Sequence, residues 1–587
     1  MRIPRGAFVL ILWAAAFGAP AVKPKKPPPT PEQRAAQSMM KSMSLRDKVA
    51  QLIFGACYGD VPSSKSAEFR KYRHWVGDLH LGGMIVVNRV DHGLVRYAEP
   101  HAMAVFLNQM QKLARTPLLV ASDFERGASM RVNGATKFPY NMAFAAARDV
   151  EASRFEGQMT AREARALGVQ WVLAPVADVN NNPDNPVINI RAYSENPEEV
   201  AGHVAAYIEG AHSDPKNRVL VTAKHFPGHG DTNINSHVGM ARLEASRERM
   251  EEVELKPFRA AIARGADSIM TAHMAVPAIE PEDIPATVSA KVLTGLLREE
   301  LEFKGIIITD ALDMGGVGLS SGAAAVRAIE AGADVLLMPP SPEQAIRAVV
   351  AAIEDKRLTR QRVEASVMRV LAAKSRVGLT AKTKLVNLEE ISDVLESPEE
   401  AERAQQVADH AVTLVRNQGD IVPLKNANAS CLVALVERRQ SQLGQRMLDE
   451  ARKRAPRMRM AALDASLPEA ALADALGDPS GCQVVMVATF VTASDTRNSV
   501  ALAGDLGLFL DKLSAGTAPV ILVSLGTPYL LANYPKVAAY MATFSVAPPS
   551  EAAAVKALFG EIPISGHLPV SIPGLAKYGD GIQLPAR

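Results

Sequence analysis

Short apolar runs alternate with longer helical stretches over residues 40–375 of this chain. The helical stretches are rich in alanine, glutamate and arginine. The apolar runs are nearly continuous in hydrophobic residues, which is typical of strands buried on both faces of a parallel sheet covered by helices. The predicted strands lie at 84–87, 118–120, 171–173, 219–221, 268–270, 306–308 and 335–337.

Polar residues of the kind that bind or react follow most of these runs. The active site of a (β/α)8 barrel lies at the carboxyl ends of its strands, so a series of such residues predicts a (β/α)8-type barrel with a site on that face. A doubly wound open sheet is the structural alternative, but no glycine-rich phosphate-binding motif follows the first run. The residues at the ends of the runs are Asn88, Asp123, Asp178, Lys224 with His225, His273 and Asp310.

A second alternating pattern begins near residue 406. Residues 376–405 are polar and helical, which indicates a connector between two domains. We expect the barrel domain to span 38–375 and a second α/β domain to span 406–587. The strands predicted for the second domain lie at 414–415, 432–436, 484–488, 520–523 and 539–544.

The first residues have the features of an export signal. Arg2 and Arg5 precede an apolar run over 7–21 that is short for a membrane span. Five prolines in 23–31 then predict a stiff linker, which we place at 22–37 after a signal peptide at 1–21. We therefore expect a periplasmic or secreted protein without stable membrane insertion after cleavage. An uncleaved anchor is the alternative.

Composition adds few constraints. Of the 587 residues 48% are hydrophobic, and the formal net charge is +2, so nothing favours nucleic acid or a membrane surface as a partner. The three cysteines, Cys57, Cys431 and Cys482, are far apart and lie in or beside apolar stretches. We expect all three to be buried free thiols.

The segment 224–237 concentrates reactive side chains. It reads Lys-His-Phe-Pro-Gly-His-Gly-Asp-Thr over 224–232, followed by Asn-Ser-His at 235–237. The proline and glycines are incompatible with a regular helix, so we expect the end of a strand that continues into a rigid polar loop. His225, His229, Asp231 and His237 are all metal-ligand types, which makes a metal hydrolase a rival interpretation. Pro227 and Gly228 oppose it, because they prevent His225 and His229 from sharing a helical turn.

This segment resembles the signature of glycoside hydrolase family 3, in the branch of β-N-acetylglucosaminidases. All nine positions of 224–232 match, whereas Asn235 stands where the family usually has aspartate. The resemblance implies a (β/α)8 TIM-type barrel followed by an α/β sandwich. It also implies a retaining exo-β-N-acetylhexosaminidase that acts on terminal N-acetylglucosamine of cell-wall or chitin-type glycans, through a covalent glycosyl-enzyme and without a cofactor or metal.

The resemblance assigns two catalytic roles. Thr-Asp-Ala-Leu-Asp-Met at 309–314 is similar to the nucleophile segment of the family, which makes Asp310 the expected nucleophile. His237 matches the acid/base, which the residue at 235 orients. An amide oxygen of Asn235 can accept the ring N–H but cannot stabilise the imidazolium by charge. We therefore expect a less basic His237, weaker catalysis, or Asp231 as a substitute acid.

The resemblance also assigns the sugar-binding positions. They are Asp123, Arg131, Arg191, Lys224 and His225, with a second group of candidates that shape the pocket: Asn235, Asp231, His229, Asp178, His273 and Met274. Carboxylates accept and arginines donate hydrogen bonds, as binding of sugar hydroxyls requires. Arg126 departs from the family, because a glycine usually occupies that position.

Two further functions stay open. A neutral histidine tolerates phosphate as the attacking group, so a glycoside phosphorylase of the same fold is one alternative. The other is a catalytically weakened, glycan-binding homologue, which Asn235 favours.

Overall fold

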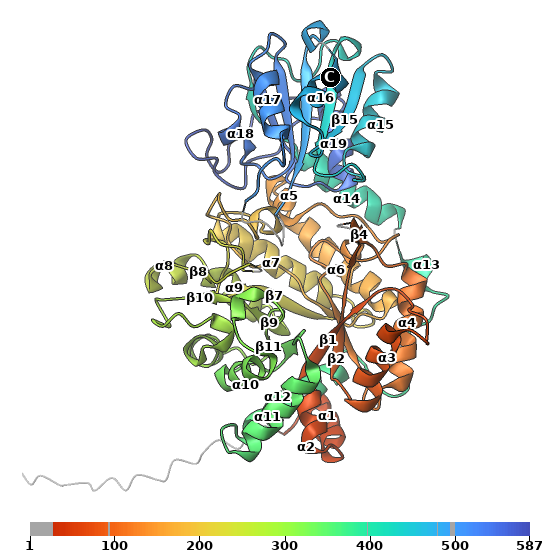
Figure 1. The fold of residues 1–587 in the computed structure, drawn as a ribbon, viewed down its shortest axis with the longest axis vertical. Helices are drawn as coiled ribbons and strands as arrows, with labels where there is room; N and C mark the ends of the chain where they lie inside the picture. Colours follow the sequence, from red (N-terminus) through yellow and green to blue (C-terminus); the bar gives the residue numbers. More distant parts are fainter. Residues whose placement is uncertain (1–27, 92–93, 237, 396, 478, 494–498) are drawn as a thin grey trace, which may run out of the picture.

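The computed structural model describes residues 28–587 except 92–93, 237, 396, 478 and 494–498. Two domains stack on each other along the long axis of the molecule (Figure 1). The first contains the helices and strands from α1 to α12, and the second those from β13 to α19.

The first domain is the predicted barrel. Its eight strands are all parallel and follow the order β11-β9-β7-β6-β5-β2-β1-β12. A bridge between Ile308 and Val335 brings the two end strands together. The strands are β1 Ile53–Tyr58, β2 Gly83–Val87, β5 Leu119–Ser122, β6 Trp171–Val172, β7 Leu220–Phe226, β9 Ser268–Thr271, β11 Ile306–Ile308 and β12 Leu336–Leu337.

Helices surround this barrel, and their ends are specified locally. Helix α6, for example, begins after Asp149, whose side chain accepts from the N–H of Ala152, and it ends at Gly168 in the left-handed conformation. The helices are α2 Leu45–Ala50, α3 Ala67–Arg73, α4 Pro100–Leu113, α5 Asn141–Ala146, α6 Val150–Leu167, α7 Pro197–His212, α8 Arg247–Glu252, α9 Leu255–Ala263, α10 Ser321–Ala331, α11 Pro342–Glu354 and α12 Arg360–Arg376.

Strand β1 was not predicted, and Gly55 explains why. A glycine interrupts its apolar sequence and weakens the strand pattern. In the fold, a Cβ at Gly55 would lie 2.7 Å from the ring of Trp75, so the close packing of that ring requires a glycine. The tertiary contact therefore accounts for the residue that obscured the strand.

A helix begins inside the segment that was predicted as a linker. Helix α1, Pro31–Lys41, begins within the range 22–37 that we assigned to the linker, and it packs against α12. Thr30 caps the helix through a capping box with Gln33, and Pro31 occupies the first turn, where proline is tolerated. Pro31, the last of the five prolines, thus starts a helix rather than extends the linker.

The second domain contains a six-stranded sheet in the order β13-β18-β17-β16-β14-β15. All its pairs are parallel except that of β13 with β18. Its strands are β13 Thr413–Asn417, β14 Cys431–Val436, β15 Arg459–Asp464, β16 Val485–Val491, β17 Val520–Gly526 and β18 Ala539–Ala542, and its helices are α15 Gln445–Arg454, α16 Glu469–Leu476, α17 Leu506–Ser514, α18 Leu530–Asn533 and α19 Pro548–Phe559. The edge strand β15 was not predicted, because its apolar run at 460–463 is short and contains no β-branched residue, and two of its six residues are exposed.

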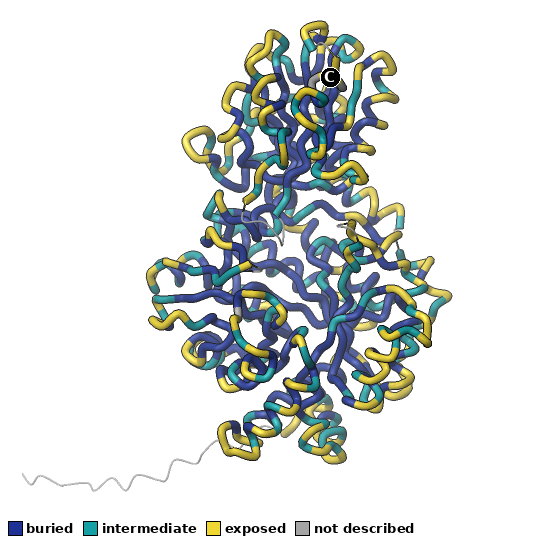
Figure 2. The backbone as a smooth tube through the Cα atoms, in the orientation of Figure 1, coloured by how far each residue is buried: buried dark blue, intermediate teal, exposed yellow. Residues whose placement is uncertain are grey.

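The two domains share a hydrophobic core. Met142 and Ile190 of the first domain pack in one cluster with Leu568 and other buried residues of the second. Hydrogen bonds cross the same interface, such as those from the N–H and hydroxyl of Ser571 to Glu195, both at 2.7 Å. Helix α14, Pro398–Ala411, crosses the predicted boundary at 405 and packs against both α5 and α19. Figure 2 shows buried segments running through both domains.

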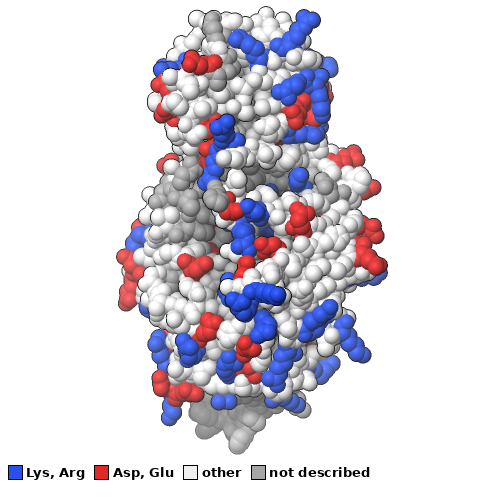
Figure 3. Space-filling view, turned by 45° about the vertical axis from the view of Figure 1, so that its right-hand side comes forward, with Lys and Arg blue, Asp and Glu red and all other residues white. Residues whose placement is uncertain are grey.

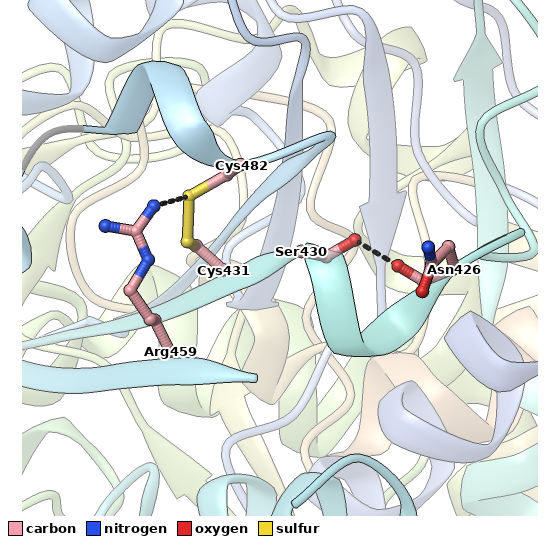
Figure 4. Close-up of a disulfide and its surroundings, with 5 residues drawn as sticks. All are labelled: Asn426, Ser430, Cys431, Arg459 and Cys482. Carbon is pink, nitrogen blue, oxygen red and sulfur yellow. Dashed lines mark hydrogen bonds between the residues drawn. A yellow bond between two sulfur atoms is a disulfide. The ribbon is translucent and has the colours of Figure 1, made fainter. Parts of the chain in front are cut away.

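Two of the three cysteines form a disulfide, which corrects the prediction of free thiols. Cys431 begins β14 and Cys482 precedes β16, its neighbour in the sheet, so their Cα atoms lie 5.8 Å apart (Figure 4). Their separation of 51 residues concealed this proximity in the sequence. Cys57 is a buried free thiol, as predicted. Among the described residues, no helix combines the length and apolar character needed to cross a bilayer.

Candidate active site

A cavity of about 520 Å³ opens at the carboxyl ends of the barrel strands. The polar side chains that line the cavity come from the ends of the barrel strands and from the loops that follow these strands. Thr492 and Ala493, directly after β16, also line the cavity, so the second domain contributes to its wall. The predicted residues brought together here are Asp123, Arg131, Arg191, Lys224, His225 and Asp310. Around the junction of the domains, basic and acidic side chains lie close together on the surface (Figure 3).

Lys224 is the centre of a buried charge cluster. Its Nζ lies 2.8 Å from Oδ1 of Asp123 and 2.7 Å from Oε1 of Glu125. The other oxygen of Asp123 accepts from Arg131 at 3.0 Å. Burial opposes the charge of Lys224, but Asp123 and Glu125 hold its pKa above the ordinary value. The cluster thus keeps its charges in a site shielded from water.

Glu125 is a site residue that the sequence analysis missed. Its carboxylate accepts from Nε and NH2 of Arg191 at 2.9 and 2.8 Å, a bidentate pair. Burial opposes ionisation, yet Arg191 and Lys224 hold the pKa of Glu125 well below its usual range. The signal in the sequence was its position two residues after Asp123, since alternate residues of an extended segment share a side.

His225 is oriented from behind by Asp178. Nδ1 of His225 lies 2.8 Å from Oδ2 of Asp178, and Nε2 lies 3.3 Å from NH2 of Arg191. The backbone N–H groups of His225 and His229 both donate to Oδ1 of Asp178, at 3.1 and 2.7 Å. Asp178 is fully buried and lies outside the cavity lining, so it supports the loop and the ring instead of facing a ligand.

His229 is also a supporting residue. Its Nδ1 lies 2.9 Å from the hydroxyl of Thr232, and burial lowers its pKa to about 4, so the ring is neutral at pH 7. Asn185 donates to the carbonyls of His229 and Gly230, at 2.8 and 3.0 Å. These contacts hold the polar loop that follows β7, in the strand-to-loop arrangement expected from the sequence.

Asp310 lies two residues after the end of β11 and is half-buried in the cavity wall. One of its oxygens accepts from the N–H of Ala311 at 2.8 Å. The buried His273 binds the same turn, with Nε2 2.9 Å from the carbonyl of Ala311 and Nδ1 2.8 Å from the hydroxyl of Thr287. His273 therefore positions the turn that carries Asp310. Met274 is buried in β10, Met274–Ala275, which pairs with β8, Ala241–Arg242, outside the lining.

The predicted acid/base, His237, lies outside the described residues, but the chain on either side of it is placed. The carbonyl of the buried Asn235 accepts from the N–H groups of Val238 and Gly239, at 2.9 and 3.0 Å. A Cβ at Gly316, six residues after Asp310, would lie 2.9 Å from the carbonyl of Ser236. The loop that carries His237 thus packs against the loop that follows Asp310.

The remaining candidates do not form a metal centre among the residues that the structure describes, where no group of three or more His, Cys, Asp and Glu side chains is arranged to hold an ion. Asp231 is half-exposed and lies 3.4 Å from NH2 of Arg249. His225 and His229 each direct Nδ1 to another partner, Asp178 and Thr232.

Comparisons with known proteins identify the family of the chain. The family model described as glycosyl hydrolase family 3 N terminal domain matches residues 44–373. A protein of Cellulomonas fimi named beta-N-acetylglucosaminidase/beta-glucosidase is 28% identical over 520 residues, which are 84% of this chain and 88% of the relative. Beta-hexosaminidase A of Pseudoalteromonas piscicida is 31% identical over 357 residues, 56% of this chain and 58% of the relative. The solved structure of a glycoside hydrolase family 3 beta-N-acetylglucosaminidase from Paenibacillus sp. str. FPU-7 superposes with a TM-score of 0.78 at 30% identity, covering 90% of this chain and 99% of that one.

Proposed function

The chain belongs to glycosyl hydrolase family 3 and is a glycoside hydrolase, and we propose that it is a retaining exo-β-N-acetylhexosaminidase. Its substrates would be glycans of the cell-wall or chitin type that end in N-acetylglucosamine. The names of the relatives support the sugar preference.

One observation carries this proposal: Asp310 lines the same cavity as the cluster around Lys224. The cluster presents carboxylates, a lysine, arginines and an imidazole, which together can accept from and donate to the hydroxyls of a terminal sugar. A carboxylate at the wall of that cavity is suited to attack the anomeric carbon.

The mechanism then has two steps. Asp310 forms a bond to the anomeric carbon as the bond to the leaving oxygen breaks, and His237 protonates that oxygen. His237 next takes a proton from water, whose oxygen attacks the anomeric carbon and releases Asp310. Two displacements at one carbon return the β configuration. The close approach of the Ser236 carbonyl to Gly316 supports this role, because it places the residue before His237 near the loop that follows Asp310.

The test is the hydrolysis of nitrophenyl β-N-acetylglucosaminide by the wild type and by Asp310→Asn. We expect loss of at least about 10³-fold in kcat for the variant, since the nucleophile is removed. Asp355→Asn, an exposed site at the end of α11, is the matched control and should retain activity. NMR of the first product should show the β-anomer.

Three outcomes would contradict the proposal. Release that requires added phosphate would indicate a phosphorylase, and binding of N-acetylglucosamine without turnover would indicate a glycan-binding homologue. Preference for nitrophenyl β-glucoside would indicate a β-glucosidase, the second activity in the name of the Cellulomonas fimi relative.

We also propose that the protein is exported to the periplasm or secreted. The apolar run at 7–21 and the Cys431–Cys482 disulfide support this, because disulfides persist mainly in oxidising compartments. Cell fractionation and intact mass would test it. A mass that retains residues 1–21 in the membrane fraction would support the uncleaved anchor instead.

A further inference from the structure

Arg126 lies in the cavity wall beside the charge cluster, in the position where the family usually has glycine. Glu125 and Gly127 on either side of it form an isolated bridge, and Gly127 has a φ of 78°. Glu125 points inward to Lys224 and Arg191. The side chain of Arg126 instead lies over the ring of Tyr140, 4.9 Å from its centroid.

Arg126 differs from the other cations of the cavity in what surrounds it. Arg131 pairs with Asp123, Arg191 pairs with Glu125, and Lys224 pairs with both carboxylates. Across the described residues, no carboxylate lies within ion-pair distance of Arg126. Burial opposes its charge, but Tyr140, Tyr97 and Glu125 hold its pKa above the ordinary value. The guanidinium therefore keeps its charge and its capacity to bind an anion.

The exposed fractions of the lining residues distinguish the floor of the cavity from its mouth. Lys224, on the floor at the end of β7, is 2% exposed. Val90 and Val95 line the same cavity and are 63% and 49% exposed. They belong to the hairpin of β3, Arg89–Asp91, and β4, Leu94–Arg96. Val90 and Val95 thus give the mouth an exposed apolar surface, and the half-buried Tyr140 and Arg126 line the same cavity.

A substrate bound by its terminal sugar would place its other part there. The floor offers the sugar a dense set of paired charges. Val90 and Val95 offer apolar contacts, and Arg126 offers a guanidinium that has no carboxylate partner among the residues that the structure describes. Burying part of a cation is favourable when a ligand supplies the opposite charge. The chemistry of the mouth therefore suits an aglycone with both an apolar surface and an acid.

We propose that Arg126 binds a carboxylate on the aglycone, so that the enzyme prefers N-acetylglucosaminides whose leaving group is acidic. This rests on the proposed function for the identity of the sugar. The acid can belong to a second sugar or to another kind of aglycone, and the same guanidinium would bind either.

Binding measurements test this without catalysis. The probes are 3-carboxyphenyl and 3-carbamoylphenyl 1-thio-β-N-acetylglucosaminide, which resist hydrolysis and differ only in charge at the aglycone. By calorimetry we expect the wild type to bind the acid about tenfold or more tightly than the amide, the scale of a charge-assisted pair. Arg126→Gln should bring this ratio close to one, and Arg126→Lys should retain part of it. Arg96→Gln is the matched control. Arg96 lies in the hairpin of β3 and β4, but it pairs with Asp91 and is outside the cavity lining. This variant should therefore keep the wild-type ratio of affinities for the two probes.

The outcomes separate this inference from the proposed function. Equal affinity for the two probes in the wild type, or an unchanged ratio in Arg126→Gln, would overturn the inference even if the enzyme hydrolyses neutral substrates. Preference for the acid without any turnover would support the inference and contradict the proposed function. Displacement of the acid probe by millimolar phosphate, together with turnover that requires phosphate, would reassign Arg126 to a phosphate acceptor and overturn the inference. Disaccharides with a lactyl ether, a uronic acid or no acid on the second sugar then identify the source of the carboxylate. Only a disaccharide whose acid reaches Arg126 should bind more weakly to Arg126→Gln than to the wild type.

Discussion

Oδ2 of Asp178 lies 2.8 Å from Nδ1 of His225, and the aspartate is fully buried behind the cavity. An acceptor at this position keeps the proton on Nδ1, so that the lone pair of Nε2 faces Nη2 of Arg191, 3.3 Å away in the cavity wall. The same aspartate binds two backbone N–H groups of the loop after β7. One carboxylate thus determines both the tautomer of the His225 ring and the path of the loop after β7.

Asp178→Asn should weaken sugar binding more than chemistry. If the amide oxygen keeps the backbone contacts, its NH2 group faces Nδ1 of His225 and moves the ring proton to Nε2. We expect KM for nitrophenyl β-N-acetylglucosaminide to rise about tenfold with a smaller change in kcat, the scale of one lost hydrogen bond to a charged group. Asp267→Asn is the matched control, since Asp267 is a buried aspartate that pairs with His212 far from the cavity. It should lower Tm without raising KM; an equal rise in KM for both variants would contradict the assignment.

Asn235→Asp should restore a charge beside the proposed acid/base. A carboxylate stabilises imidazolium, so the pKa of His237 should rise, and the basic limb of the pH–rate profile should move to higher pH. We expect kcat at pH 6 to increase about tenfold, in the range of general acid–base effects. The double variant Asn235→Asp with His237→Ala should lose the shift. An unchanged profile in the single variant would show that residue 235 does not act through His237.

Lys374 gives the stability of the protein a distinctive pH dependence. It is fully buried, its Nζ donates to Gln51 at 2.7 Å, and burial lowers its pKa to about 7. Between pH 7 and about 10 the unfolded chain therefore binds one proton more than the folded protein, so stability rises with pH. Relative to Lys374→Met, the wild type should gain up to about 1.4 kcal/mol per pH unit in this range.

Urea unfolding at several pH values measures this slope. Lys112→Met, at an exposed position in α4, should show no such difference from the wild type. A flat difference between the wild type and Lys374→Met from pH 7 to 10 would show that Lys374 titrates near its ordinary pKa.

Reduction of the Cys431–Cys482 disulfide should destabilise the second domain. The bond closes a loop with a sequence separation of 51, for which the chain-entropy model predicts a contribution of about 4 kcal/mol. Urea unfolding with and without reductant measures the loss, and the double variant Cys431→Ala with Cys482→Ala should be insensitive to reductant. Thiol titration of the unfolded oxidised protein should detect Cys57 alone; three reactive thiols would show that the bond does not form.

Most strands could be predicted from the sequence because burial on both faces leaves continuous apolar runs. In the two main sheets the exceptions are β1 and β15, and both have local causes. Gly55 interrupts β1 to make room for Trp75, and β15 is a partly exposed edge strand. Thr30 and Pro31 are typical of a helix N-terminus and indicated the start of α1, but the neighbouring prolines favoured a linker.

Site residues could be predicted from the sequence where they follow a predicted strand or belong to a recognisable motif. Asp310 and Lys224 meet both conditions, and the structure places them in one cavity. Glu125 did not stand out, because its role depends on Arg191, which lies 66 residues away in the chain. Asp178 and His273 are predicted to shape the pocket; both lie outside the cavity lining and contact the residues and turns that form it.

The sequence by itself determined the alternation of strands and helices, the order of the two domains and the motif around Lys224, because hydrophobic period and local spacing are properties of neighbouring residues. The tertiary structure decided which distant groups meet. It paired Cys431 with Cys482, enclosed Lys224 between two carboxylates, and left Arg126 in the cavity with an aromatic ring and no carboxylate partner among the described residues. These relationships depend on the barrel and the packing of the domains, which bring together side chains that are far apart in the sequence and exclude the water that would otherwise weaken their interactions.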